Sequence, residues 1–223
     1  MSPKAVLGLF LQTVLAFTLI LLAWGLDDWR GFFAEPARAG LVAVAGLTLA
    51  AVLVLRLDVQ PFRKGQRPVG RQRYLLPGIM LVGLSLIAFL PYADRRGLLT
   101  FAEAGGLRWL GLALYVVGNA LAFAAVKTLG KQYSGYVTLQ EDHRLVQEGL
   151  YGVIRHPIYL RALLVMIGLP LVFRSWLFLV MLPLGAVFVA ARIRAEEKLL
   201  GEQFGAEFEA YRKRTWRLLP YVY

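Results

Sequence analysis

Long apolar stretches set the fold class of this chain, because each exceeds what the core of a soluble domain requires. A helix as long as the first run, Ala5 to Leu26, measures ~33 Å and can cross a hydrocarbon core of about 30 Å. Similar runs follow at Ala39–Leu57, Tyr74–Tyr92 and Gly106–Val126. A cleaved signal peptide would end in a cleavage site made of small residues. The first run ends instead in Trp24-Gly25-Leu26-Asp27-Asp28, which does not match such a cleavage site. We therefore predict an all-α polytopic membrane protein.

The last apolar stretch, Ile158 to Arg192, would form a helix of about 50 Å and overshoot any bilayer. Its polar break, Arg174-Ser175, is flanked by Pro170 and Pro183, which favour a bend. The sequence thus predicts a tight helical hairpin that supplies spans five and six, with the fifth span short. The total is about six transmembrane helices.

A further helix is expected after Arg192, where the last span leaves the membrane. Its apolar stripe is formed by Leu200, Phe204, Phe208 and Tyr211, at spacings of four, four and three, with charged residues elsewhere. This pattern predicts a C-terminal amphipathic helix lying in the membrane interface. Glu197 stands one turn before Leu200 on the same stripe, so its carboxylate should face the protein and need a partner.

The 25 basic residues are distributed unevenly around these spans. If the N-terminus is cytoplasmic, nineteen lie on inner segments and six on outer ones, in agreement with the positive-inside rule. We therefore expect a multi-pass protein, in a bacterial inner membrane, with its central loop and C-terminus facing the cytoplasm. The net charge of +11 is explained by topology and anionic headgroups, and the basic loops match no nucleic-acid-binding fold.

The longest polar interval between spans runs from His143 to Tyr159 and contains both histidines of the protein. It gathers candidate site residues beside turn-forming Gly149 and Pro157, namely His143, Arg144, Tyr151, Arg155, His156 and Tyr159. The chain has no Cys, which excludes thiol nucleophiles and Cys-bound metals. It also lacks the Rossmann, P-loop, zinc-protease and EF-hand motifs, so no metal site is expected.

The motifs then resemble a known superfamily, that of isoprenylcysteine carboxyl methyltransferase and phospholipid methyltransferase. The resemblance rests on Leu145-Val146, Gly149, Tyr151, Arg155-His156-Pro157-x-Tyr159, Arg192, Glu196-Glu197, Phe204-Gly205, Tyr211 and Pro220. Their order and gaps agree across Lys127 to Pro220, outside the first three spans. We therefore divide the chain into an N-terminal transmembrane scaffold, 1–104, and a methyltransferase-like core, 105–223.

The resemblance implies that S-adenosyl-L-methionine binds without a Rossmann domain. By similarity, the cofactor-binding residues would be His143, Leu145, Val146, Tyr151, His156, Pro157, Tyr159 and Glu197, and the catalytic residues Arg192 and Glu197. Arg192 would face a lipophilic or amphipathic acceptor reached through the bilayer. Two departures concern the acceptor side: Leu150 replaces a frequent Pro, and Arg161 replaces a common small residue.

Other interpretations stay open at this point. His156 could satisfy a buried turn, Tyr159 could anchor a span at the interface, and Arg192 could be a topological cation. The membrane sterol reductases share an Arg-His-Pro-like motif but bind a nicotinamide cofactor and have longer chains. A non-catalytic membrane subunit is the second rival. The sequence does not indicate the acceptor or the oligomeric state.

Overall fold

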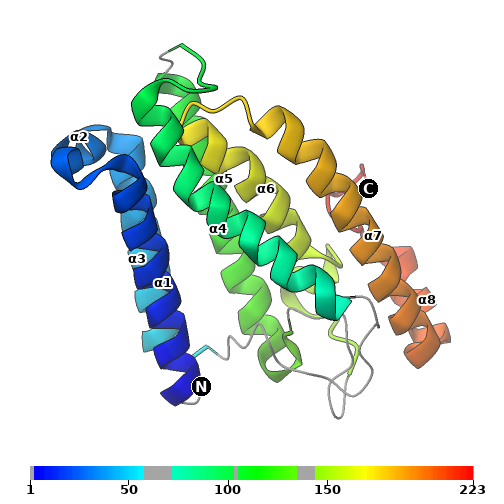
Figure 1. Ribbon diagram of the computed structural model, residues 1–223. Coiled ribbons are helices and arrows are strands. Elements are labelled where there is room, and N and C mark those ends of the chain that lie inside the picture. The colour runs from blue at the N-terminus through cyan, green and yellow to red at the C-terminus, as the bar shows by residue number, and fades with distance from the viewer. Residues whose placement is uncertain (1–2, 58–71, 103–104, 135–143, 223) are drawn as a thin grey trace.

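Long helices make up nearly all the regular structure of the computed structural model, which describes residues 3–57, 72–102, 105–134 and 144–222 (Figure 1). The α-helices are α1 (Pro3–Trp24), α2 (Trp29–Ala34), α3 (Pro36–Val54), α4 (Gln72–Arg96), α5 (Gly105–Leu129), α6 (Pro157–Val172), α7 (Phe178–Phe204) and α8 (Ala206–Arg214). Short 3-10 helices are η1 (Leu26–Asp28), η2 (Gly130–Gln132) and η3 (Gly149–Gly152). The described residues form no strand, only two isolated bridges. The all-α prediction is confirmed.

The predicted membrane spans coincide with long helices. Four of them, α1 from Val6, α3, α5 and α7, are long and apolar enough to cross a membrane. Helix α4 covers the predicted third span, and α6, with 16 residues, is about 24 Å long. The polytopic helical architecture is therefore confirmed, and the count of six spans stays a prediction.

The predicted hairpin lies between α6 and α7 and is confirmed. Arg174 takes a positive φ of 51°, and the Ser175 amide donates to the Pro170 carbonyl at 2.8 Å, which ends α6. The turn is also fixed from outside, since the Phe101 amide donates to the Arg174 carbonyl at 2.8 Å. The segment after α4 therefore holds the hairpin in place at the upper end of the molecule in Figure 1.

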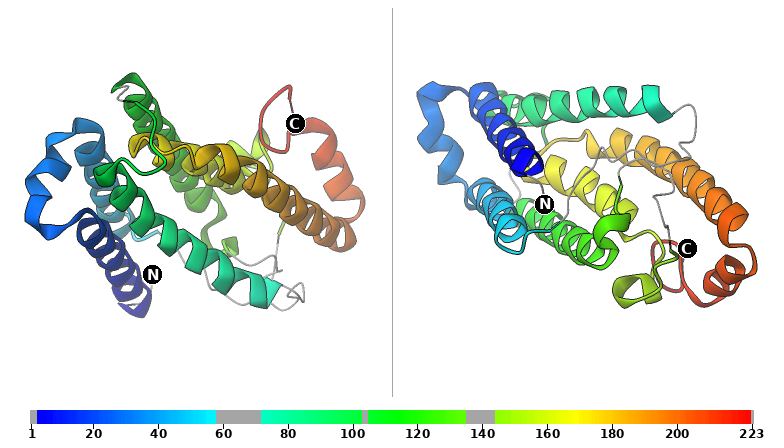
Figure 2. Two further views of the ribbon diagram at one scale, coloured as in Figure 1. Left: turned by 45° about the horizontal axis from the view of Figure 1, so that its top comes forward. Right: turned by 90° about the horizontal axis from the view of Figure 1, so that it is seen from below.

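Helices α5 and α6 approach each other closely at the centre of the molecule (Figures 1 and 2). A Cβ atom at Gly111 would lie only 2.6 Å from the Gly168 carbonyl oxygen, and one at Gly168 would lie 2.7 Å from that of Gly111. Larger residues would force the backbones apart, so glycine is required at this contact. On one side, α3 packs against α5, and α1 packs against α4 and α3; on the other side, α7 packs against α6, and α8 packs against α7.

A buried ion cluster joins the N-terminal helices to the rest of the protein. Asp94, at the end of α4, accepts hydrogen bonds from Arg38 on α3 at 2.7 Å, Arg108 on α5 at 3.0 Å, and Arg174 in the hairpin at 2.7 Å. The apolar core beside it also draws on both parts of the chain, including Phe32 and Val172. Packing therefore crosses residue 104, and the division into 1–104 and 105–223 stays a prediction.

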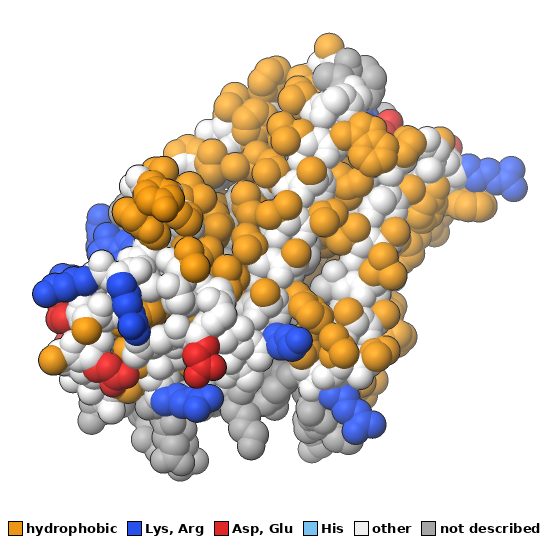
Figure 3. Space-filling model, turned by 180° about the vertical axis from the view of Figure 1, so that it is seen from behind, with side chains coloured by type: hydrophobic (Ala, Val, Ile, Leu, Met, Phe, Trp, Pro, Cys, Tyr) orange, Lys and Arg blue, Asp and Glu red, His pale blue; other side chains and the backbone are white. Residues whose placement is uncertain are grey.

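The outer surface of the helices is broadly apolar. Leu47 on α3 is 70% exposed, and Val187 on α7 is 72% exposed. Hydrophobic side chains cover a wide region of the face shown in Figure 3, whereas Lys, Arg, Asp and Glu gather mainly toward its ends. Such a surface suits a helix bundle embedded in lipid.

The C-terminal region differs from the single amphipathic helix expected there. Helix α7 does not end near Arg192 but continues to Phe204, and Gly205, with a φ of 49°, turns the chain into the separate α8. The predicted stripe is thus broken after Phe204. Phe208 and Tyr211 on α8 are buried against the protein, at 1% and 3% exposure, so they do not face the membrane interface as expected.

Candidate functional site

The polar loop before α6 is held by the C-terminal tail. Gly149, with a φ of 55°, starts η3 close to Thr128 at the end of α5, and the chain then pairs with the tail. The Arg155 amide donates to the Trp216 carbonyl at 2.8 Å, and the His156 amide donates to the Arg217 carbonyl at 3.0 Å. Two segments about sixty residues apart are therefore joined by backbone hydrogen bonds.

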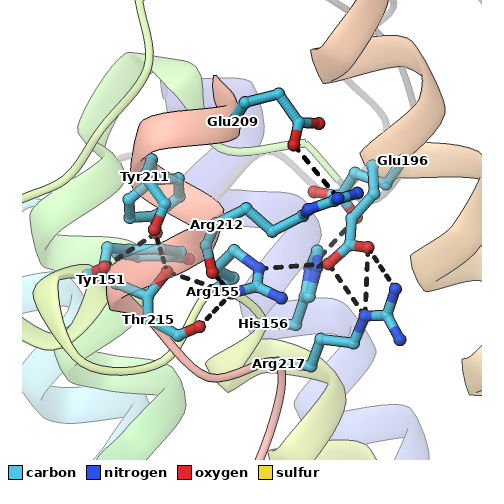
Figure 4. A network of polar contacts seen from close by, with 10 residues as sticks. Tyr151, Arg155, His156, Glu196, Glu209, Tyr211, Arg212, Thr215 and Arg217 are labelled. Atoms are coloured by element: carbon cyan, nitrogen blue, oxygen red, sulfur yellow. Dashed lines mark hydrogen bonds and ion pairs between the residues drawn. The ribbon is translucent and has the colours of Figure 1, made fainter. Parts of the chain in front are cut away.

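Glu197 on α7 is the centre of the polar cluster formed there, and its partners Arg155, His156 and Arg217 are labelled in Figure 4. Its carboxylate accepts from Arg155 Nε at 3.1 Å and from Arg217 Nη2 at 2.8 Å, and it lies 3.3 Å from His156 Nε2. Only 7% of Glu197 is exposed. The prediction of an inward-facing carboxylate with a partner is thus confirmed. The prediction of one continuous apolar stripe, from which it was inferred, was wrong.

Arg155 links this carboxylate to α8 and the tail. Its Nη1 donates to the Arg212 carbonyl at 3.1 Å and to the Thr215 hydroxyl at 3.1 Å, and it also contacts the Thr215 carbonyl. The Tyr211 hydroxyl donates to the Tyr151 carbonyl at 2.7 Å. The same few side chains therefore close the end of α8 against the loop (Figure 4).

On the side of the cluster toward α6, Tyr159 connects the loop to α7. Arg192 Nε donates to the Tyr159 hydroxyl at 3.2 Å, and the guanidinium lies 5.6 Å from the ring centroid, a cation–π distance. The rings of Tyr159 and His156 are 5.6 Å apart. The structure thus brings Arg192, Tyr159, His156 and Glu197 together from α7 and the start of α6.

Burial keeps the phenols of this region protonated. Loss of hydration raises the pKa of the Tyr211 phenol to about 12, and burial also raises that of Tyr151, with the Glu196 charge adding to the effect. Both tyrosines are therefore neutral hydrogen-bonding groups with aromatic faces at physiological pH. Neither is suited to act as a base.

The remaining predicted residues lie on the same loop. Leu145 and Val146 are half-buried in its irregular segment, and Pro157 is the buried first residue of α6, where its fixed φ suits the start of a helix. His143 lies outside the described residues. Glu196 is the neighbour of Glu197, and its carboxylate is 3.8 Å from His156 Nδ1.

Thr215 and Arg217 were not predicted from the sequence as site residues, and Arg155 was a candidate of the polar interval with no role assigned to it. Arg155 belongs to the Arg-His-Pro motif, so its type and position were visible, but a partner on α7 was not. Arg217 and Thr215 follow α8 without any recognisable motif. Only the return of the tail onto the loop brings Arg217 to Glu197 and Thr215 to Arg155.

A pocket of about 460 Å³ lies on the outer side of the cluster, between α7, α8 and the tail. Its lining combines opposite charges, from Arg194, Lys198, Arg212 and Arg217 on one hand and Glu197, Glu202 and Glu209 on the other. Such a lining suits a zwitterionic ligand. Within the described ranges, no group of acidic or histidine side chains has the arrangement of a metal site.

Known proteins are similar in sequence to this part of the chain. The model of the isoprenylcysteine carboxyl methyltransferase (ICMT) family matches residues 109–202. The probable protein-S-isoprenylcysteine O-methyltransferase of Oryza sativa subsp. indica is 28% identical over 117 residues, 51% of this chain and 61% of the relative. The Saccharomyces cerevisiae enzyme of that name is 34% identical over 116 residues, 51% of this chain and 48% of the relative.

The chain therefore matches about half to three fifths of the length of these relatives. A solved structure of the eukaryotic intramembrane Ras methyltransferase ICMT has a similar fold, with a TM-score of 0.51 at 20% identity. That similarity covers 83% of this chain and 65% of the other. Together with the apolar helices, these matches show that the chain is similar to the isoprenylcysteine carboxyl methyltransferase family over residues 109–202 and that its helical fold resembles that of the solved structure.

Proposed function

We propose that this protein is an S-adenosylmethionine-dependent methyltransferase of the membrane, acting on a lipophilic or amphipathic acceptor at the cytoplasmic face. The observation that carries the proposal is the convergence of the Arg-His-Pro-x-Tyr loop, α7 and the tail on Glu197. These are the segments in which the resemblance places the cofactor. Their joint burial at one end of an apolar bundle suits a reaction between a charged cofactor and a lipid-borne acceptor.

The residues present fit the cofactor chemically. The methionine end of S-adenosylmethionine carries an ammonium, a carboxylate and a sulfonium. Glu197 offers a carboxylate, Arg217 and His156 lie on the same cluster, and Tyr159 offers an aromatic face. A cation near an aromatic face is stabilised by the ring quadrupole, so each part of the cofactor has a counterpart here.

Individual roles follow from these positions. Tyr151, His156, Pro157 and Tyr159 would line the methionine end, with Glu197 binding a polar group of the cofactor, and His143, Leu145 and Val146 would hold the adenosine end. Glu197 already accepts hydrogen bonds from two arginines. A cofactor ammonium would therefore share its charge, or replace Arg217 as a partner.

The cofactor, when bound, supplies a methyl group already activated by the sulfonium. The protein has to orient the acceptor atom in line with the bond between the methyl group and sulfur, and it has to exclude water. Its site also has to suit the loss of positive charge as the sulfonium is neutralised. Arg192, held by Tyr159 on the inner side of α7, would position a carboxylate, thiol or amine acceptor. No metal is needed for this displacement.

The relatives named above support this proposal over its rivals, since both carry methyltransferase names. The sterol-reductase and non-catalytic interpretations are therefore not favoured. The cytoplasmic orientation and the bacterial membrane remain proposals that rest on the distribution of basic residues. Reporter fusions placed after Arg73 and after Tyr223 should both read cytoplasmic, and an external signal at either position would overturn the orientation.

Calorimetry on the purified full chain in mild detergent tests the activity. We expect saturable binding of S-adenosylmethionine and of S-adenosylhomocysteine in the presence of a chelator. Membranes that contain the protein should then transfer labelled methyl groups to a lipid-soluble product. Binding of NADPH with no response to either sulfur nucleoside would replace the methyltransferase by the reductase interpretation.

A further inference from the structure

Arg161 lies on the second turn of α6, on the face that packs against α5. A Cβ atom at Gly118 of α5 would lie 3.5 Å from the Arg161 carbonyl oxygen and from Val165 Cγ2. Gly168, which follows Val165 by three residues on α6, contacts Gly111 of α5. Arg161, Val165 and Gly168 thus follow helical spacing along one face, whereas Tyr159 and Leu160 pack toward α7.

The charge of Arg161 is not compensated within the described part of the chain. Its Nε is buried and has no hydrogen-bond partner there, and no ion pair of Arg161 is found among those residues. The buried guanidiniums of Arg38 and Arg155, by contrast, each contact a carboxylate. Arg161 as a whole is partly exposed, but a buried nitrogen of a guanidinium that lacks a hydrogen-bond partner is costly, above all in a membrane protein, and such residues mark functional positions.

The surroundings of Arg161 connect it to the candidate site. Burial raises the pKa of the Tyr133 phenol, and the nearby positive charge of Arg161 opposes that shift. Tyr133 in turn lies within electrostatic range of Tyr151, as do Tyr159 and Glu196. The guanidinium of Arg161 therefore lies on the α5 side of the same tyrosine cluster that borders Glu197.

We propose that Arg161 is an anion-binding residue of a second subsite, which takes the oxyanion group of an amphipathic molecule entering from the bilayer. A carboxylate or phosphate oxygen supplies the acceptor that the buried Nε lacks, and its charge compensates the guanidinium. Helix α6 separates this subsite from Arg192, which already contacts Tyr159. The assignment of the subsite to the methyl acceptor rests on the proposed function, whereas anion binding by Arg161 does not.

The test measures binding of matched anionic and neutral amphiphiles to the purified full chain in neutral detergent. The probes are decanoate against methyl decanoate, and dihexanoyl phosphatidylglycerol against dihexanoyl phosphatidylcholine. We expect the wild type to prefer an anionic probe over its neutral partner by about tenfold or more. Arg161→Gln should abolish that preference, and Arg161→Lys should keep part of it because the charge remains.

Lys213→Gln is the matched control, because it removes one positive charge from an exposed position on α8 and should bind like the wild type. Affinity for S-adenosylhomocysteine should stay within a few-fold in Arg161→Gln, which would show that the site is still folded. A preference for decanoate assigns the subsite to an acceptor-like carboxylate. A preference for phosphatidylglycerol alone supports the same anion site and assigns it to a phospholipid.

Equal binding of anionic and neutral probes by the wild type would overturn the proposal without any variant, as would a preference that survives unchanged in Arg161→Gln. The two proposals fail separately. A wild type that discriminates between the amphiphiles through Arg161 but binds neither sulfur nucleoside would contradict the methyltransferase activity and leave the anion subsite standing.

Discussion

Glu197 on α7 and Arg155 in the loop before α6 form a buried ion pair, with 3.1 Å between Oε1 and Nε. The pair connects α7 to the loop that ends at His156, directly before the turn of α6 that carries Tyr159. Because Arg155 also binds the end of α8 and Thr215, the pair fixes the tail as well. We therefore expect a substitution that breaks this pair to disturb both the candidate cofactor site and the packing of the tail.

Arg155→Lys should release the tail. A lysine ammonium cannot reach Glu197 with one nitrogen and Thr215 with another, as the planar guanidinium does, so several buried acceptors lose their donor. We expect a loss of roughly 2–4 kcal/mol in stability, for two or three charge-assisted hydrogen bonds. Limited proteolysis with trypsin should then cleave at Arg212–Arg214 faster than in the wild type.

Lys213→Gln serves again as the control, since it alters a charge of α8 without touching the cluster. Its cleavage at the neighbouring arginines should match that of the wild type. An Arg155→Lys protein with unchanged tail cleavage and thermal stability would show that the loop and tail are held without this side chain.

Glu197→Gln should lower cofactor affinity by about ten- to hundredfold, because it removes a charge-assisted contact worth ~1.5–3 kcal/mol. It also leaves Arg155 and Arg217 facing each other without their shared carboxylate, so the melting temperature should fall. Glu196→Gln, at a less buried position, is the comparison and should bind nearly as the wild type does. Calorimetry and thermal unfolding in the same detergent measure both effects.

The sequence predicted the parts of this site better than their connections. Apolar periodicity and the Arg174-Ser175 break were enough for the hairpin, because both are local properties of the chain. The partners of Glu197 were not predictable in the same way. They depend on the turn at Gly205, which separates α8 from α7 and folds the tail back onto the loop.

The same limit applies to the other end of the bundle. Arg38, Asp94 and Arg108 lie on three different helices and share no motif, so their sequence positions indicate only topology. Their contact arises from helix packing at long sequence separation. A single sequence contains no local signal for such a cluster.

Asp94→Asn should destabilise the fold without acting on the site directly. The substitution leaves Arg38, Arg108 and Arg174 buried or half-buried around a neutral amide, and breaking a buried pair in this way costs about 3–5 kcal/mol. We expect a large fall in melting temperature. Asp27→Asn, which affects an exposed pair with Arg95, should change it little. Similar melting of the two variants would mean that the cluster does not join the halves of the protein.

Arg192→Ala separates the reaction from cofactor binding. The Arg192 guanidinium contacts the hydroxyl and ring of Tyr159, whereas the Glu197 carboxylate is bound by Arg155 and Arg217, so the loss of Arg192 should leave the Glu197 cluster intact. Affinity for S-adenosylhomocysteine should stay within a few-fold, while transfer of labelled methyl groups to lipid-soluble product should fall by about a hundredfold or more, as for a residue that positions the acceptor. Tyr159→Phe keeps the ring but removes the hydroxyl that accepts from Arg192, and it should show a smaller loss of the same kind. If Arg192→Ala instead weakened cofactor binding as strongly as Glu197→Gln, the division of roles between the two residues would be wrong.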